Sequence, residues 1–191
     1  MKSLRLITVL IVLTGLATAQ DLASFEKRTT VKVLDNGLTV IVCERPEAPV
    51  FSFFTQVDAG SAQDPLNKTG LAHMFEHMAF KGTPTIGTTN YATEKPLLEK
   101  VEKAYSAYLA ERDKKIGRDQ QKLEQLEKAW KDAITEANKY VKPNEFPQIL
   151  ENNGAEGLNA STGEDETTYY YSFPENRLEL WAYLESERFL H

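Results

Sequence analysis

The chain is poor in the residues that make cross-links. Its 191 residues include one cysteine, Cys43, so no internal disulfide can form. Cys43 lies in an apolar stretch rich in β-branched residues, where a small buried side chain is expected, not a nucleophile. Histidine occurs only three times. Two of these histidines are four residues apart, and such clustering of a scarce residue indicates a functional site.

Positive charge and long apolar runs are also lacking. The formal net charge of −6 at pH 7 argues against nucleic acid as a partner. Residues 1–19 combine a basic start, a short apolar run and Ala17-Thr18-Ala19, which is the pattern of a cleavable signal peptide. No later stretch is long enough to span a bilayer. We therefore expect an exported protein, periplasmic or extracellular, with a mature part at 20–191 and no membrane span after cleavage.

The two neighbouring histidines belong to the sequence His73-Met74-Phe75-Glu76-His77. On an α-helix, positions i, i+3 and i+4 lie on one face, so the two imidazoles and the carboxylate would stand side by side. Imidazoles ligate zinc, and a nearby carboxylate can act as general base toward a zinc-activated water. The spacing is the inverted form of a common zinc-peptidase signature. It predicts His73 and His77 as metal ligands and Glu76 as the base.

The same helix has an amphipathic pattern. At about 100° per residue, its apolar residues fall on the side opposite the histidines. Thr69 and Gly82 are its expected N-cap and stop. We expect the apolar side to enter a core and the polar side to line a cleft. The apolar residues are Leu71, Met74, Phe75 and Met78.

Turn signals and periodicity predict the other elements. A β-hairpin is expected around Asp35-Asn36-Gly37, and the tight hairpins favour an α+β fold with a largely antiparallel sheet and helices packed on one face. Strands are expected at 29–34, 38–44, 50–59, 156–162 and 166–173, and helices at 143–151 and 176–190.

The composition changes sharply between about residues 94 and 141. Charged residues, alanine, leucine and glutamine dominate, and Gly117 is the only glycine. Apolar residues recur at helical spacing on both sides of Gly117, which predicts an antiparallel hairpin of two helices bent near that glycine. Both signs of charge are mixed, which favours a solvated surface over a charged recognition arm. A helical module that binds a partner is the alternative.

Two blocks of residues resemble the N-terminal domain of the pitrilysin/insulinase family of zinc peptidases. Residues 70–83 look like the family's active-site helix, and residues 153–174, with Asn159-Ala160-Ser161-Thr162, look like its second conserved block. The resemblance implies zinc held by His73 and His77, with Glu76 as base. It also implies a peptide substrate that adds as a strand along 158–162, beside Asn159 and Ala160.

The chain departs from the family pattern in two respects. His77 and Asn153 are 76 positions apart, where the family has a few tens, so the charged segment resembles an insertion. The family's third zinc ligand is a glutamate on a later helix, so the third ligand is expected beyond His191. The domain at 20–191 would then be incomplete at its C-terminal end. The nearer glutamates are better interpreted as turn or helix surface residues; they are Glu164, Glu166, Glu185 and Glu187.

The resemblance implies a zinc-dependent endopeptidase that cleaves peptides or unfolded segments. This chain would be its N-terminal part, and we expect it to be inactive alone. Further homologous domains or a partner subunit would close a chamber around the site. The alternative is a non-catalytic partner or scaffold subunit of a two-chain peptidase. Retention of His73, Glu76 and His77 argues against that alternative.

Overall fold

The computed structural model describes residues 22–190, so the predicted signal peptide lies outside the described residues. The chain divides into two compact units, Met1–Pro49 and Val50–His191. The fold is α+β with antiparallel strands, as predicted. Among residues 22–190, no helix combines the length and apolarity that crossing a membrane requires.

The first unit holds a helix and a β-hairpin. Helix α2 (Leu22–Arg28), which the sequence did not predict, leads directly into β1 (Thr29–Val33), and β1 pairs antiparallel with β2 (Thr39–Cys43). The tight turn between the strands needs a left-handed residue, which Gly37 supplies with φ of +88°. Cys43 is half-buried, so the expected fully buried position is not reached.

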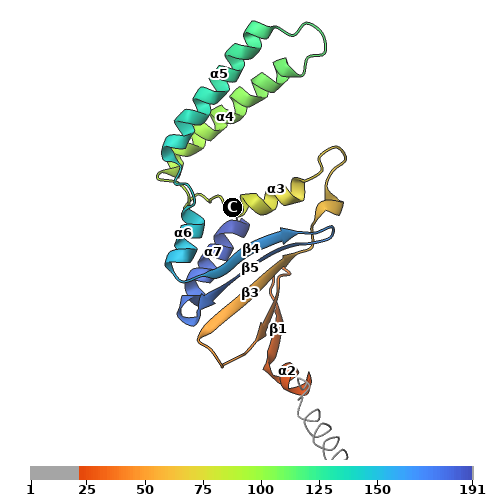
Figure 1. The fold of residues 1–191 in the computed structure, drawn as a ribbon, viewed down its shortest axis with the longest axis vertical. Coiled ribbons are helices and arrows are strands. Elements are labelled where there is room, and N and C mark those ends of the chain that lie inside the picture. The colour runs from red at the N-terminus through yellow and green to blue at the C-terminus, as the bar shows by residue number, and fades with distance from the viewer. Residues whose placement is uncertain (1–21, 191) are drawn as a thin grey trace, which may run out of the picture. The chain divides into compact units, whose positions relative to one another are not determined.

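The second unit is built on a three-stranded antiparallel sheet in the order β3–β5–β4 (Figure 1). Strand β3 (Val50–Val57) pairs with β5 (Thr167–Pro174) along its length, and β4 (Glu156–Thr162) pairs with the other side of β5. Alternate residues of β5 are aromatic and buried: Tyr169, Tyr171 and Phe173. Strand β4 is therefore an edge of this sheet within residues 50–190.

The core lies between the aromatic face of β5 and two helices, α6 (Glu145–Asn152) and α7 (Leu178–Leu190). Phe146 and Leu150 of α6 and Leu184 of α7 are at most 1% exposed. Burying a side chain of this size stabilises a fold by about 1.5–3 kcal/mol. The short 3₁₀ turns are Ser61–Gln63 (η1), Asn138–Tyr140 (η2) and Glu175–Arg177 (η3).

One charged group of α7 is buried against expectation. Glu185 was predicted on a helix surface, yet its carboxylate accepts a hydrogen bond from Tyr171 Oη at 2.9 Å and pairs with Arg188. Burial raises the pKa of Glu185, and the Arg188 guanidinium opposes that rise. The helical pattern missed this position because the partner, Tyr171, lies on a strand.

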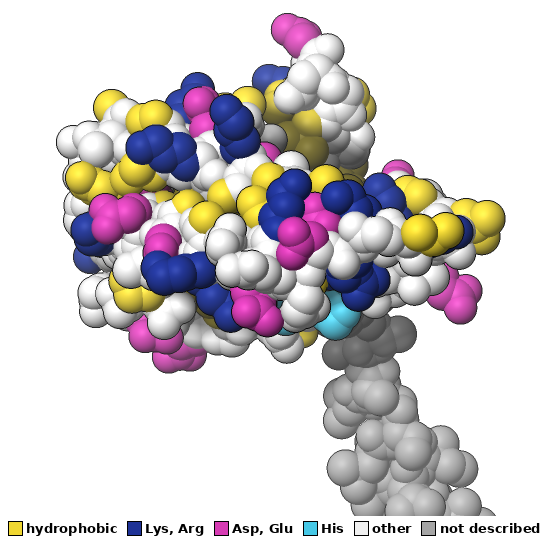
Figure 2. Space-filling model, turned by 90° about the horizontal axis from the view of Figure 1, so that it is seen from above, with side chains coloured by type: hydrophobic (Ala, Val, Ile, Leu, Met, Phe, Trp, Pro, Cys, Tyr) yellow, Lys and Arg dark blue, Asp and Glu magenta, His cyan; other side chains and the backbone are white. Residues whose placement is uncertain are grey.

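The charged segment forms the predicted antiparallel helical hairpin, α4 (Tyr91–Arg112) and α5 (Gln120–Ala137), with Gly117 in its bend (Figure 1). An aromatic seam joins the helices: the ring of Trp130 lies 4.7 Å from Tyr105 and 5.5 Å from Tyr108, centroid to centroid. On the face seen in Figure 2, basic and acidic side chains are interspersed. The described residues on this face of Figure 2 therefore form no large patch of one sign of charge, in line with the mixed charges of the sequence.

The two ends of the hairpin return to one place in the chain. The Thr89 amide donates to the Tyr140 carbonyl at 2.7 Å, and the Lys142 amide donates to the Gly87 carbonyl at 2.8 Å. Thr88 and Val141 form a β-bridge between these bonds. We call these paired segments, residues 87–89 and 140–142, the neck. The chain enters and leaves the hairpin through the neck.

Candidate active site

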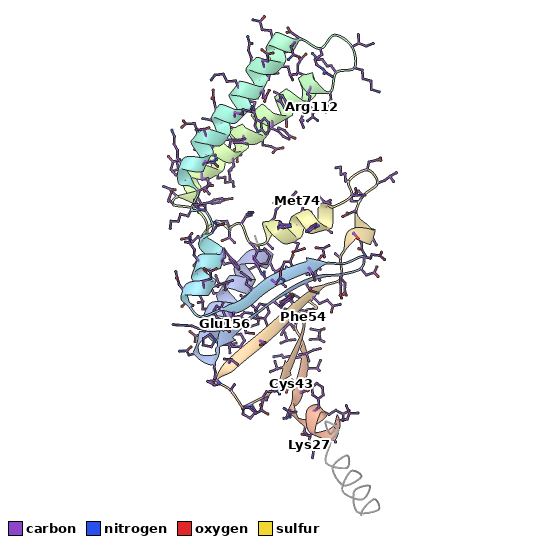
Figure 3. The ribbon with its side chains drawn as sticks, viewed as in Figure 1. Lys27, Cys43, Phe54, Met74, Arg112 and Glu156 are labelled. Carbon is purple, nitrogen blue, oxygen red and sulfur yellow. The ribbon has the colours of Figure 1, made fainter. Side chains whose placement is uncertain are left out.

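Helix α3 (Leu71–Met78) carries the histidine motif. Figure 3 labels Met74, the residue that follows His73 in this helix. It begins at Gly70, not at the predicted N-cap Thr69, and it ends before Gly82. Gly82 instead permits a tight loop, because a Cβ there would lie 2.7 Å from the Ile86 carbonyl oxygen. The predicted cap and stop are therefore wrong, although the helix itself is present.

The N-terminus of α3 is capped from a distance. Asp64 Oδ2 accepts hydrogen bonds from the amides of Gly70 at 2.6 Å and Leu71 at 3.2 Å, and Oδ1 accepts from Ala72 at 2.9 Å. These bonds satisfy amides that a helix start leaves without partners. The Ala72 amide, with those of Gly70 and Leu71, holds the pKa of Asp64 below its ordinary value.

Helix α3 turns a different side to the sheet from the one predicted. Glu76 is 7% exposed, whereas Met74, Phe75 and Met78 are 55–59% exposed. Half-buried Ala72 and Ala79 flank Glu76 at helical spacing, so small side chains let the helix lie close to the sheet. The prediction that the apolar side enters a core is wrong for the described residues. The sheet takes the carboxylate side because a strand supplies a donor for it.

That donor is Thr162, the last residue of β4. Its Oγ1 donates to Glu76 Oε2 at 2.7 Å, across 86 positions of sequence. Glu76 Oε2 also lies 3.9 Å from His73 Nε2. Thr162 belongs to the second block of the predicted resemblance, but no role was predicted for it. No periodicity in the sequence links the end of a strand to a helix so far away.

His73 and His77 lie on the exposed flank of α3, and histidine side chains reach the surface in Figure 2. Their Nε2 atoms are 3.1 Å apart. Two nitrogens bound to one tetrahedral zinc at about 2.0–2.1 Å lie roughly 3.3 Å from each other, so the pair fits as two ligands of one ion. Within residues 22–190, no group of three metal-binding side chains is assembled.

The two predicted substrate residues lie on the edge strand but on opposite faces. Asn159 pairs with Tyr170 and Ala160 with Tyr169, and successive strand residues point to opposite sides. Ala160 therefore shares its face with Thr162, the residue that reaches Glu76. Asn159 is exposed, and its Oδ1 accepts from the Ala160 amide at 2.9 Å.

The turn after β4 is fixed to the segment that leads into α3. The amides of Ser61 and Ala62 donate to the carbonyls of Gly163 at 2.9 Å and Glu164 at 2.8 Å. A Cβ at Gly60 would lie 2.5 Å from the Glu164 carbonyl oxygen, so only glycine permits this approach. Edge strand, turn and motif helix are thus held together.

Comparisons with known proteins agree with this arrangement. Residues 39–115 match the family model described as Insulinase (Peptidase family M16). The mitochondrial-processing peptidase subunit beta of Lentinula edodes is 41% identical over 71 residues, which are 37% of this chain and 15% of that protein. The insulin-degrading enzyme of Drosophila melanogaster is 44% identical over 50 residues, 26% of this chain and 5% of that enzyme.

A solved structure shows a similar fold. A protease from Helicobacter pylori superposes with a TM-score of 0.52 at 21% identity, covering 84% of this chain and 25% of that one. The relatives and the solved structure are described as a processing peptidase subunit, an insulin-degrading enzyme and a protease. Residues 39–115 match the model of the insulinase family, so the predicted resemblance to the N-terminal domain of that family is confirmed. The matched segment covers only a small part of each relative.

Proposed function

We propose that this chain is the N-terminal part of a zinc-dependent endopeptidase. His73 and His77 would hold the zinc ion, and Glu76 would act as general base. The supporting observation is that two Nε2 atoms lie 3.1 Å apart, beside a carboxylate that is 7% exposed. The third ligand would come from a segment beyond His191, as in the family pattern.

Zinc, when bound, would polarise the peptide carbonyl and lower the pKa of the attacking water toward about 7. Glu76 would take the proton of that water and pass it to the leaving amine. Its burial suits this role, because a dry carboxylate interacts strongly with the charges that develop beside it. His73 and His77, on the exposed flank, leave the approach to the metal open.

The substrate would be an extended peptide or unfolded segment. Strand β4 is an edge, so its outer N–H and C=O groups can pair with an added strand. Ala160 would face the peptide on the side of α3, and its small side chain would leave room there. Asn159 would meet the peptide on the opposite face of the sheet.

We further propose that the protein is exported to the periplasm or the extracellular space. The composition of residues 1–19 supports this proposal. A second homologous domain or a partner subunit would close the site. The support here is that five of the relatives are described as subunits, and that the matched segment spans 15% of the Lentinula edodes protein.

A non-catalytic partner subunit is the second candidate. One relative, cytochrome b-c1 complex subunit 1 of Rattus norvegicus, is 37% identical over 71 residues and is described as a complex subunit, not a peptidase. The motif of His73, Glu76 and His77 is complete in this chain. A protein that served only as a scaffold would have no chemical use for all three.

Zinc binding and peptide hydrolysis by the purified chain test the proposal. We expect zinc to bind in equilibrium dialysis, His77→Ala to weaken binding, and His191→Ala, which removes the histidine outside the motif, to leave it unchanged. Any zinc-dependent cleavage of an unstructured peptide should be abolished by Glu76→Gln. Equal zinc binding by the parent and His77→Ala would contradict the proposed site. Robust turnover by the chain alone would refute only the expectation that it is inactive without partners.

A further inference from the structure

We propose that Thr162 is a positioning residue for Glu76, one that fixes the carboxylate of the base from the strand proposed to bind substrate. The proposal rests on the proposed function in so far as Glu76 is the base. The hydrogen bond from Thr162 Oγ1 to Glu76 Oε2, at 2.7 Å, is the observation that carries it.

The Glu76 side chain needs an external anchor. Glutamate has three rotatable side-chain bonds, and its freedom is costly to remove. In the described part of the chain, Thr162 is the one hydrogen-bond donor to this carboxylate. A bond to Oε2 sets the plane of the carboxylate and leaves Oε1 for proton transfer.

Thr162 is itself rigidly held. It pairs with Thr167 of β5, and its β-branched side chain has few rotamers. The residues that follow are fixed by the bonds from Ser61 and Ala62. The position of the hydroxyl is therefore set by the sheet.

In this arrangement, strand β4 would both bind the peptide and orient the Glu76 carboxylate. A peptide added to β4 takes its register from residues 158–162, and Thr162 of the same strand aligns the base. Ala160, two residues earlier, faces the same side. A shift of β4 would move the peptide and the base together, so the attacked carbonyl would keep its place beside Glu76.

Two substitutions and a matched control test the role. Thr162→Val is isosteric and removes only the hydroxyl, whereas Thr162→Ser restores it. Thr168→Val makes the same change at a residue that is 4% exposed and whose hydroxyl contacts Ser161 Oγ at 2.8 Å. Ser161 and Thr162 are successive residues of β4, so this control removes a hydroxyl contact from the other face of the sheet.

The first measurement is the conformation of Glu76 by NMR side-chain couplings in the full chain without metal. We expect one conformer in the parent, Thr162→Ser and Thr168→Val, and averaging in Thr162→Val. A single unchanged conformer in folded Thr162→Val would overturn the proposal. This readout does not depend on turnover, so a failure of the proposed function leaves it decisive.

The second measurement is peptide hydrolysis with zinc, in the full chain with whatever subunit completes its activity. Losing a group that orients catalytic machinery typically costs about 10–100-fold in activity. We expect that loss in kcat for Thr162→Val, with KM unchanged and with recovery in Thr162→Ser. Equal losses in Thr162→Val and Thr168→Val would show a general effect on the sheet and would overturn the positioning role. Absence of turnover in the parent is the result expected of a chain that lacks its third ligand or its partner, and the NMR result then decides the positioning role of Thr162.

Discussion

Asp64 shows how one side chain can replace a local helix cap. Gly70 at the N-cap of α3 has no side chain to offer, so a carboxylate six positions earlier uses both oxygens to accept from three amides. Helices usually take this acceptor from the N-cap residue itself. The backbone of the 64–70 loop brings Asp64 to the start of α3. The cap thereby helps to fix the position of the motif residues on that helix.

Replacing Asp64 with Asn should loosen the start of α3, because an amide group keeps only one acceptor oxygen. The pKa of Asp64 is lowered on folding, so its stabilising contribution is complete above its unfolded pKa of about 3.8 and is lost as the pH falls through the lower folded value. Thermal unfolding followed by circular dichroism should show Asp64→Asn less stable than the parent at pH 6. The two should converge as the pH falls well below 3.8.

The control for this comparison is Asp58→Asn, which makes the same chemical change in the loop before η1. We expect its melting temperature at pH 6 to match that of the parent, because Asp58 is exposed. A constant gap between Asp64→Asn and the parent from pH 6 to pH 2.5 would contradict the charge-based explanation.

At the scale of elements, the sequence predicted what local chemistry determines. The β1–β2 turn followed from Asn36-Gly37, and the bend between α4 and α5 followed from Gly117. The side of α3 that meets the sheet could not be predicted. A helical pattern separates two faces but does not say which one a neighbour covers, and the deciding donor, Thr162, lies 86 positions away.

The tip of the α4–α5 hairpin is closed by another carboxylate. Glu111 is 2% exposed, and it accepts from Lys114 Nζ at 2.7 Å and from the Asp119 amide at 3.0 Å. Lys122 Nζ lies 3.4 Å from the same side chain. Lys114 foremost, with the Asp119 amide, lowers the pKa of Glu111 to about 2. The end of one helix is thereby joined to the start of the next.

Glu111→Gln should therefore destabilise the hairpin in a pH-dependent way. Because the folded pKa is below the ordinary value, the stabilisation is complete above about pH 4.5 and disappears as the pH falls toward about 2. Helical circular dichroism during thermal unfolding should show the variant melting earlier at pH 6 and matching the parent near pH 2. Glu127→Gln, which removes an exposed pair with Lys131, should have little effect at either pH.

At the scale of the whole molecule, the candidate site and the hairpin belong to separable parts of the second unit. The site depends on α3, β4 and the residues at 60–64. The hairpin leaves and re-enters the chain at the neck between Thr89 and Tyr140. Its aromatic seam and its Glu111 cluster are internal to it.

Removing the hairpin should leave the proposed zinc site intact. We would replace residues 90–139 with Asn-Gly, a two-residue turn suited to antiparallel segments, since Thr88 and Val141 already form a bridge. The shortened chain should bind zinc as the parent does in equilibrium dialysis and should unfold cooperatively. Loss of zinc binding in a folded shortened chain would show that the hairpin supports the site.

The neck also bears on how quickly the site can assemble during folding. Glu76 and Thr162 must meet across 86 positions, and closing so long a loop is entropically costly and slows folding. Most of that distance lies in the α4–α5 hairpin, whose two helices pack on each other through Tyr105, Tyr108 and Trp130. Once the neck has closed, the effective loop between Glu76 and Thr162 is far shorter, so we expect the length of the hairpin to have little effect on the folding rate.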